Sequence, residues 1–466
     1  MKKYFLLSSV AMSLLFAACN SKKPDTPIPD DGNVVKLTGD ISADQTLTAD
    51  KKYVLEGFVY VTNGATLTIE PGTVIFGDKQ SHGSLIITRG AKINAVGTPS
   101  KPIVFTSEME AGSRKEGDWG GVILLGKAPV NPSGGKAKIE GGLTPTVASK
   151  EEDYIWYGGN DAGDNSGTMK YVRIEFAGVA FSPDNEINGL TLGGVGSGTT
   201  ISYVQVYRSG DDAFEWFGGT VNCDHLIATN SWDDDFDTDF GFSGRVQFAL
   251  AQRWKNTADV SGSNGFESDN DGNGSTNTPQ TKAVFSNVTI VGPVKGKANG
   301  TSGINANFQH AAQIRRNSSL SIVNSVLMGF PVGLYIDDTK VTSHKTSDNA
   351  LEGGLKFQNN IIAGCGTDLK TSTPEFDINA WFANHSNTIL DSTQQVKIAD
   401  AYKFSSAVSS DNGTPDFRLK SGSPAASGAS FSGLSGFQNV NFIGAFDEQN
   451  NWIADWTTWD AENNVY

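Results

Sequence analysis

Hydrophobic and polar residues alternate in short runs along most of the chain, and many of its 53 glycines stand between the runs. A period of two predicts β-strands, and almost no segment shows the period of an amphipathic helix. The clearest repeat is residues 203–224 (YVQVYRSGDDAFEWFGGTVNCD), which superimpose without a gap on residues 225–246 (HLIATNSWDDDFDTDFGFSGRV). Tandem repeats of this kind are typical of the stacked coils of a solenoid.

The aligned strands predict which side chains point into the solenoid. One column is hydrophobic at every level, and because side chains alternate across a strand, the next residue must point outward. The inward column is Leu190, Phe214, Phe236, Phe266, Ile314 and Leu334, and the outward column is Thr191, Glu215, Asp237, Glu267, Arg315 and Tyr335. A third column, two residues before the inward one, holds Asn188, Asp212, Asp234 and Asn264.

A separate column of asparagines is expected at one corner of the later coils. Asn287, Asn324 and Asn359 occupy the same place in three short hydrophobic segments (FSNVTIVG, IVNSVLMG and FQNNIIAG). Asparagines at a coil corner can stack and hydrogen-bond to one another and to the neighbouring backbone. We therefore interpret this column as structural.

The limits of the solenoid follow from weaker patterns. Residues 66–75 (TLTIEPGTVI) align with residues 84–93 (SLIITRGAKI) at an offset of 18, so the coils begin early, and we predict the solenoid over residues 35–445. Residues 446–466 are expected to form a C-terminal cap. Trp452, Trp456 and Trp459 would share one face of a short helix and cover the open end of the last coil. A sugar-stacking platform is the alternative role for these tryptophans.

The N-terminus has the pattern of a lipoprotein signal peptide. Lys2 and Lys3 precede an apolar run that is too short to span a bilayer, and the run ends in Ala17-Ala18-Cys19. Cleavage after residue 18 would leave Cys19 as the lipidated residue, followed by a polar spacer to residue 34. The lipid would be the only attachment to the membrane.

Charge and cysteine content narrow the partners. The formal net charge is −15, and removal of the two leader lysines makes it more negative, so nucleic acid and anionic membrane surfaces are excluded as partners. Cys223 and Cys365 would lie several coils apart, which is too far for a disulfide. Both are expected to be small core residues.

Several segments resemble one known family. They are GDWGG (117–121), YVRIEFAG (171–178), PDNEINGLTLGGVGSGT (183–199), GDDAFEWFGGT (210–220) and SGSNGFESDND (261–271). Behind a lipobox, these segments resemble the right-handed parallel β-helix outer-membrane lipoproteins of Bacteroidota. The resemblance implies an all-β, single-domain, pectin-lyase-like solenoid anchored in the outer membrane, on either face of it. It implies no established activity.

The aligned carboxylates are the best candidate site. Two carboxylates about 5 Å apart repel by roughly 3 kcal/mol at an effective dielectric constant near 20, so a counter-charge is expected. Arg315 can supply one and Ca²⁺ another, because hard oxygen ligands at flexible spacing suit Ca²⁺. A solvated acidic face is the alternative. The candidate metal ligands are Asp212, Asp234, Asp237, Asp269 and Asp271, the last two from a DNDGNG turn that is not an EF-hand.

These patterns favour a non-catalytic binding or accessory protein, most simply a monomer. Its partner would be a glycan or an outer-membrane protein, with Trp232 available to stack on a sugar ring. The candidate binding residues are Asp211, Asp212, Glu215, Asp233, Asp234, Asp237, Glu267, Trp232 and Arg315. The alternative is a polysaccharide lyase or glycoside hydrolase that uses Asp212, Asp234 and Arg315.

Overall fold

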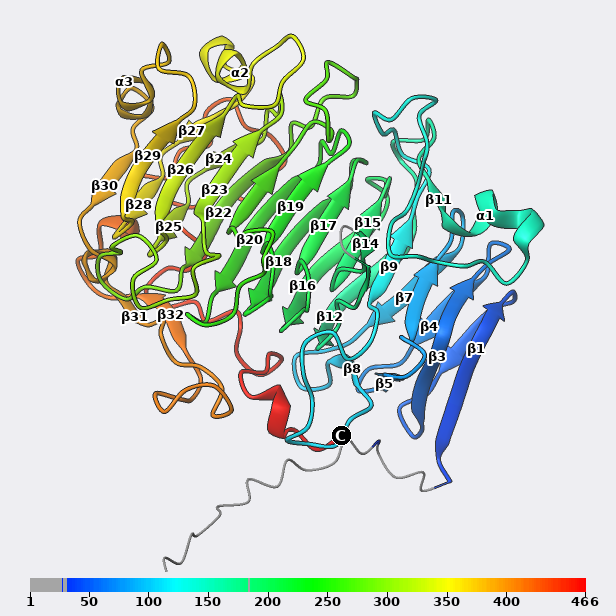
Figure 1. Cartoon of the computed structure of the whole chain (residues 1–466). Coiled ribbons are helices and arrows are strands. Elements are labelled where there is room, and N and C mark those ends of the chain that lie inside the picture. The colour runs from blue at the N-terminus through cyan, green and yellow to red at the C-terminus, as the bar shows by residue number, and fades with distance from the viewer. Residues whose placement is uncertain (1–26, 28–31, 183–184) are drawn as a thin grey trace, which may run out of the picture.

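The chain folds as a parallel β-helix. The computed structural model describes residue 27, residues 32–182 and residues 185–466, so the leader and Cys19 lie outside the described residues. Twenty-six strands form one hydrogen-bonded parallel sheet that winds around a common axis (Figure 1). In the described part of the chain, no helix is long and apolar enough to cross a bilayer. The all-β solenoid predicted from the repeat is confirmed.

Each coil runs through three strand positions, which we call columns A, B and C. Column A holds β2 (Gln45–Leu47), β4 (Thr66–Ile69), β7 (Lys92–Val96), the first parts of β12 (Gly167–Glu175), β16 (Thr200–Tyr207), β18 (Asn222–Thr229), β20 (Arg245–Gln252) and β22 (Val284–Val291), then β24 (Ser321–Val323) and β27 (Phe357–Gln358). Column B holds the first parts of β1 (Val34–Ile41) and β3 (Lys52–Val61), β5 (Val74–Gly77), β8 (Ile103–Ser107), the second parts of β12, β16, β18, β20 and β22, then β25 (Val326–Met328), β28 (Ile361–Ala363) and β30 (Thr388–Leu390). Column C holds the ends of β1 and β3, then β6 (Ser84–Ile87), β9 (Val122–Leu125), β15 (Leu190–Gly193), β17 (Phe214–Phe217), β19 (Phe236–Asp239), β21 (Phe266–Ser268), β23 (His310–Arg315), β26 (Val332–Asp337) and β29 (Thr367–Thr371).

The remaining elements lie outside the coils. Three antiparallel pairs are β10 (Ala137–Lys138) with β11 (Trp156–Tyr157), β13 (Ala180–Ser182) with β14 (Asn185–Glu186), and β31 (Ile398–Asp400) with β32 (Asp416–Leu419). The helices are α1 (Glu151–Ile155), α2 (Thr346–Glu352) and α3 (Ile378–Ala383), with 3₁₀ turns at Ala148–Lys150, Thr393–Val396, Pro424–Ala426 and Ala461–Asn463.

The inward column is confirmed at its three phenylalanines. Phe214 pairs with Phe236 and Phe236 with Phe266, and all three side chains are fully buried. Their ring centroids lie 5.8 and 5.3 Å apart. Cys223 and Cys365 are also buried as free thiols, as expected of core residues.

Two predicted registers are wrong. Glu267 pairs with Gln313, so Ala312 and not Ile314 continues the inward column, and Gln313 and not Arg315 continues the outward one. In the first coils Thr66 pairs with Lys92 and Phe58 with Ser84, so residues 66–75 run through columns A and B, whereas residues 84–93 run from column C into column A of the next coil. In both places, two alignments of the strands give similar hydrophobic patterns. The hydrogen bonds between the strands follow the alignment that the sequence did not predict.

The corner between columns A and B carries an unexpected aromatic stack. One residue per coil has a left-handed φ of 52° to 59°: Tyr171, Tyr203, His225, Phe248, Asn287, Asn324 and Asn359. Asparagine tolerates this conformation, whereas aromatic residues adopt it only where packing over-determines it. Here the rings stack from coil to coil, with centroids 4.5 Å apart for Tyr171 and Tyr203 and 4.1 Å for Tyr203 and His225.

The C-terminal segment packs along this corner and does not cap the last coil. Asn287 and Asn324 donate to the carbonyls of Phe442 and Ser430. Trp456 packs edge-on against Tyr171 and Tyr203, far from the last coil. The predicted tryptophan helix and end cap are therefore wrong. The segment closes the exposed side of the corner column, which is apolar because of its rings.

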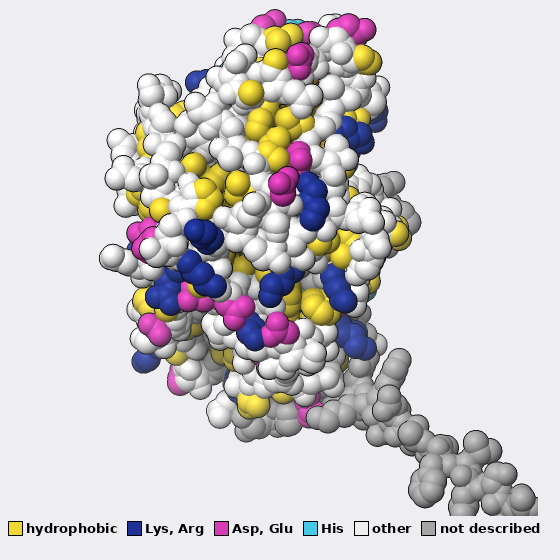
Figure 2. Space-filling model, turned by 90° about the vertical axis from the view of Figure 1, so that its left-hand side faces the viewer, with side chains coloured by type: hydrophobic (Ala, Val, Ile, Leu, Met, Phe, Trp, Pro, Cys, Tyr) yellow, Lys and Arg dark blue, Asp and Glu magenta, His cyan; other side chains and the backbone are white. Residues whose placement is uncertain are grey.

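The last coil is covered by other residues. Trp381 and Phe382 of α3 are buried in the main core, and the Phe382 ring lies 5.9 Å from that of Phe357 in β27. Figure 2 shows the molecule from this end, where hydrophobic side chains form small separate patches and Lys and Arg side chains gather across the lower part. Covering the edge strand in this way limits pairing with other chains.

Candidate functional site

The candidate site lies on the outer face of column C, on β17, β19, β21 and the turns before them. Glu215 pairs with Asp237 and Asp237 with Glu267, so the predicted outward column is confirmed at these three levels. The turns before these strands place Asp211 and Asp212 beside Asp233 and Asp234 of the next coil. We call these seven residues the carboxylate ladder.

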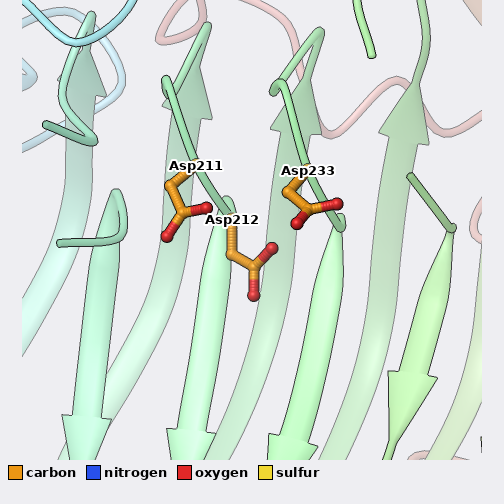
Figure 3. Close-up of side chains that lie close together, drawn as sticks. All are labelled: Asp211, Asp212 and Asp233. Atoms are coloured by element: carbon orange, nitrogen blue, oxygen red, sulfur yellow. The ribbon is translucent and has the colours of Figure 1, made fainter. Parts of the chain in front are cut away.

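Carboxylate oxygens of the ladder converge in three overlapping groups. Within each group the oxygens lie within 4.8 Å of one another; the groups are Asp211 with Asp212 and Asp233, Asp212 with Glu215 and Asp237, and Asp234 with Asp237 and Glu267. Figure 3 shows the first group: Asp211 and Asp212 stand on the turn before β17, and Asp233 stands on the next turn. The carboxyl group of Asp212 lies between the other two. This spacing is close enough for shared ligation of a cation.

Two ladder residues also hold successive turns together. An oxygen of Asp212 accepts the backbone N–H of Asp234 at 2.7 Å, and an oxygen of Asp234 accepts the backbone N–H of Asn264. Asn264 accepts the backbone N–H of His310 in the same way, at 3.1 Å. Asp212 and Asp234 thus each use one oxygen to hold the next turn, and both residues also belong to the convergent groups.

Burial and mutual repulsion raise the pKa values of the ladder. Burial is the main cause for Asp211, Asp212, Glu215, Asp234 and Asp237, and neighbouring carboxylates raise the pKa of each further above its ordinary value. Burial likewise raises the pKa of Glu267 to about 8 and that of Asp233 to about 6. In the absence of a cation, protons must therefore replace part of the negative charge.

Several oxygens in or beside the ladder are buried without a hydrogen-bond partner in the described part of the chain. They include Oδ1 of Asn188, of Asp233 and of Asp237. The Asn188 side chain is 1% exposed, and its Nδ2 donates to Glu215. A buried oxygen without a hydrogen-bond donor has lost its hydration, and no protein contact compensates for that loss of free energy. A bound cation would satisfy these oxygens.

The basic end of the face differs from the predicted arrangement. Arg315 lies two residues beyond the outward column, yet its guanidinium still pairs with Glu267 and, at 2.8 Å, with Asp269. Arg316 also pairs with Asp269. The predicted counter-charge at this end is therefore present.

The two candidate metal ligands from the DNDGNG turn have other partners. Asp269 is held by both arginines, and Asp271 accepts the backbone N–H groups of Asn273 and Ser275 at 2.9 and 3.2 Å. Neither belongs to a convergent group of carboxylates. Asp271 acts as a turn-forming residue.

Two residues at the site were missed by the sequence reasoning. Glu140 lies on the excursion between β9 and β12, and its carboxyl group meets Glu215; burial raises the pKa of Glu140 to about 7. No repeat pattern reveals it, because the excursion is an insertion. His310 continues the column of Asp212, Asp234 and Asn264, which the correct register would have shown.

His310 is held neutral at the basic end of the ladder. Burial lowers its pKa to about 3. Its Nδ1 lies 2.8 Å from Oδ1 of Asn264, so Nδ1 carries the proton and Nε2 has a free lone pair. Trp232 lies beside the ladder on the turn that carries Asp233, and its side chain is 43% exposed, as its suggested stacking role requires.

Residues 39–408 match the family model described as a pectate-lyase like beta helix domain, and the chain belongs to this family. No curated protein matches the chain. Among solved structures it is similar to pectate lyase Pel9A, with 14% identity, a TM-score of 0.39 and coverage of 89% of this chain and 87% of that one. It is also similar to the Agl-KA catalytic domain (11% identity, TM-score 0.27, coverage 74% and 61%) and to the Dettilon tailspike protein gp208 (12%, 0.22, 76% and 70%).

Proposed function

We propose that this chain is a non-catalytic binding protein that holds Ca²⁺ in the carboxylate ladder and uses the loaded face to bind a glycan. The observation that carries the proposal is the convergence of carboxylate oxygens in three overlapping groups beside buried oxygens that lack partners. Ca²⁺ takes six to eight oxygen ligands in flexible geometry, which mixed carboxylate and amide oxygens supply. The groups contain no His or Cys, which favours Ca²⁺ over Zn²⁺.

A glycan suits the loaded face better than a protein partner. Sugar hydroxyls can complete the coordination of a partly hydrated Ca²⁺, and the exposed ring of Trp232 offers an apolar surface next to Asp233. A protein partner remains the second form of the same binding role.

The test is calcium binding by the soluble mature chain. Calorimetric titration with calcium should show saturable binding. In a separate thermal scan, calcium should raise the melting temperature. Asp212→Asn with Asp234→Asn should abolish both, since asparagine keeps the oxygen that accepts the turn N–H but removes the charge. The matched control is Asp391→Asn with Glu448→Gln, which removes two exposed charges elsewhere. An unchanged melting temperature in millimolar calcium would refute the proposal.

A polysaccharide lyase or glycoside hydrolase is the second candidate. Membership in the pectate-lyase like family and the neutral imidazole of His310 favour it. Arg315 is a poor base. Burial lowers the pKa of its guanidinium, but Glu267 and Asp269 raise that pKa above its ordinary value. New reducing ends or unsaturated uronides from a polysaccharide, lost on Asp234→Asn or Arg315→Ala, would favour the enzyme. Under our proposal these substitutions change binding alone.

We also propose that Cys19 is lipidated and anchors the protein in the outer membrane. The support is the leader pattern that ends in Ala17-Ala18-Cys19. Cys19→Ala should abolish acyl labelling and release the protein from the membrane fraction. Acyl labelling that persists in this variant would refute lipidation at Cys19.

A further inference from the structure

A separate pocket of about 380 Å³ lies near the N-terminal end of the solenoid. It is formed where the chain leaves column C after β3, β6 and β9, and α1 closes it from the side. Pockets of roughly 300 to 1,000 Å³ suit small ligands. The excursion between β9 and β12 contributes to both places, with Glu140 beside the carboxylate ladder and Lys127 and Lys150 in the pocket.

The lining of this pocket is basic in a chain of strongly negative net charge. Arg89, Lys127 and Lys150 line it, against one acidic residue, Asp153. Within the described residues, neither lysine has an ion-pair partner. The pocket therefore concentrates positive charge where the rest of the molecule repels anions.

The guanidinium of Arg89 is held in place, and Lys127 lies close to the turn at Gly90. Arg89, whose side chain is only 13% exposed, donates through Nη2 to the carbonyl of Glu152 at 2.8 Å and pairs with the carboxylate of the same residue at 3.6 Å. Lys127 lies against Gly90, with Nζ 2.9 Å from the point where a Cβ atom of residue 90 would be. The absence of a side chain at Gly90, whose φ is +88°, thus leaves room for the ammonium group beside the turn.

We propose that this pocket binds a compact oxyanion carried by a saccharide: a sulfate, phosphate or carboxylate group on a sugar ring. Two lysines without ion-pair partners in the described part of the chain, beside the guanidinium of Arg89 that Glu152 holds through Nη2, match the charge of such a group. The remaining lining includes the polar side chains of Thr62 and Asn63, which can bond to ring hydroxyls, and the volume exceeds that of the anion alone. The site needs no calcium and is independent of the proposed function of the ladder.

The experiment is calorimetric titration of the mature full-length chain at low ionic strength, in EDTA. The probes are sodium sulfate, sodium phosphate, sodium acetate, glucose 6-sulfate, glucose 6-phosphate, galacturonate and, as a neutral control, glucose. At least one charged sugar should bind more tightly than its matching free anion, and added salt should weaken binding. The sugar that binds identifies the source of the anion.

Variants locate the binding. Lys127→Gln with Lys150→Gln should weaken binding of that sugar at least about tenfold. Lys51→Gln with Lys92→Gln removes the same charge from exposed positions outside the pocket and should leave it unchanged. Asp212→Asn with Asp234→Asn should also leave it unchanged. The proposal is overturned if no charged sugar binds, if free anions bind equally well, or if the control lysine pair weakens binding as much.

Discussion

Arg253 and Asp235 form a fully buried ion pair behind the carboxylate ladder, with Nη1 and Oδ1 3.0 Å apart. The same guanidinium donates to the carbonyls of Asp233 and, at 3.2 Å, of Trp232. Burial raises the pKa of Asp235 to about 6, and Arg253 opposes that rise. This one side chain therefore positions the turn that carries Trp232, Asp233 and Asp234.

Asp235→Ala should destabilise the fold by about 3 to 5 kcal/mol, because it leaves the guanidinium of Arg253 buried without its partner. Replacing both residues, as Asp235→Leu with Arg253→Met, should cost less. Urea denaturation of the purified variants measures both effects. Glu56→Ala, which breaks the exposed pair with Lys36, serves as a control and should cost at most about 1 kcal/mol. A loss for Asp235→Ala as small as that of the control would contradict the role of the pair.

Side chains of successive strands in column C stack directly on one another. The packing of each coil therefore depends on the side chains in the coils above and below it. Phe236 lies between Phe214 and Phe266, with no exposed surface. Phe236→Ala should cost about 3 to 5 kcal/mol, since the rigid coils above and below cannot close the cavity. Phe236→Leu, which keeps most of the volume, should cost less. Equal stability of Phe236→Ala and the wild type in urea would show that the column collapses to fill the gap.

How far sequence predicts this molecule depends on insertions between the strands. Phe214, Phe236 and Phe266, with the acidic residues beside them, were placed correctly because their hydrophobic pattern is strong at each level. The long loop before β23 hides the spacing to the next level, so Arg315 was placed two residues out of register. Glu140 was missed because it comes from an excursion outside the repeat. Its contact with Glu215 depends on how that excursion folds back, which no periodic pattern encodes.

The corner column failed prediction for a different reason. Local preference favours Asn or Gly at a left-handed φ, so the sequence indicated the corner only at Asn287, Asn324 and Asn359. At Tyr171, Tyr203, His225 and Phe248, stacking between coils and contact with the C-terminal segment stabilise the same conformation. These contacts join residues that are distant in sequence, so local conformational preference does not predict them.

At the scale of the whole molecule, the C-terminal segment connects coils that are far apart along the axis. Near an early coil Arg114 donates to the carbonyl of Ala461, and in a late coil Asn324 donates to the carbonyl of Ser430. Trp456→Ala should destabilise the fold by about 3 to 5 kcal/mol, because this buried ring packs on the corner column. Hydrogen exchange should show lost protection in residues 442–466 first. Trp232→Ala, which removes an exposed ring, is the control. Equal loss of stability in both variants would show that packing of the C-terminal segment on the corner column does not stabilise the fold.

The charge of the ladder should make the stability of the metal-free protein depend on pH. Glu267 and Asp233 have pKa values of about 8 and about 6, above those of free carboxyl groups, so the folded state binds protons that the unfolded state releases. Such groups stabilise the fold below their unfolded pKa, and this contribution is lost as the pH rises through their folded pKa. In EDTA the melting temperature should therefore fall between about pH 5 and about pH 8, whereas calcium should stabilise most at the upper end, where the ligands ionise readily. Differential scanning calorimetry in both buffers measures this, and Asp212→Asn with Asp234→Asn should flatten the fall. A melting temperature in EDTA that rises over this interval, as it would if carboxylates with lowered pKa values dominated, would contradict the prediction.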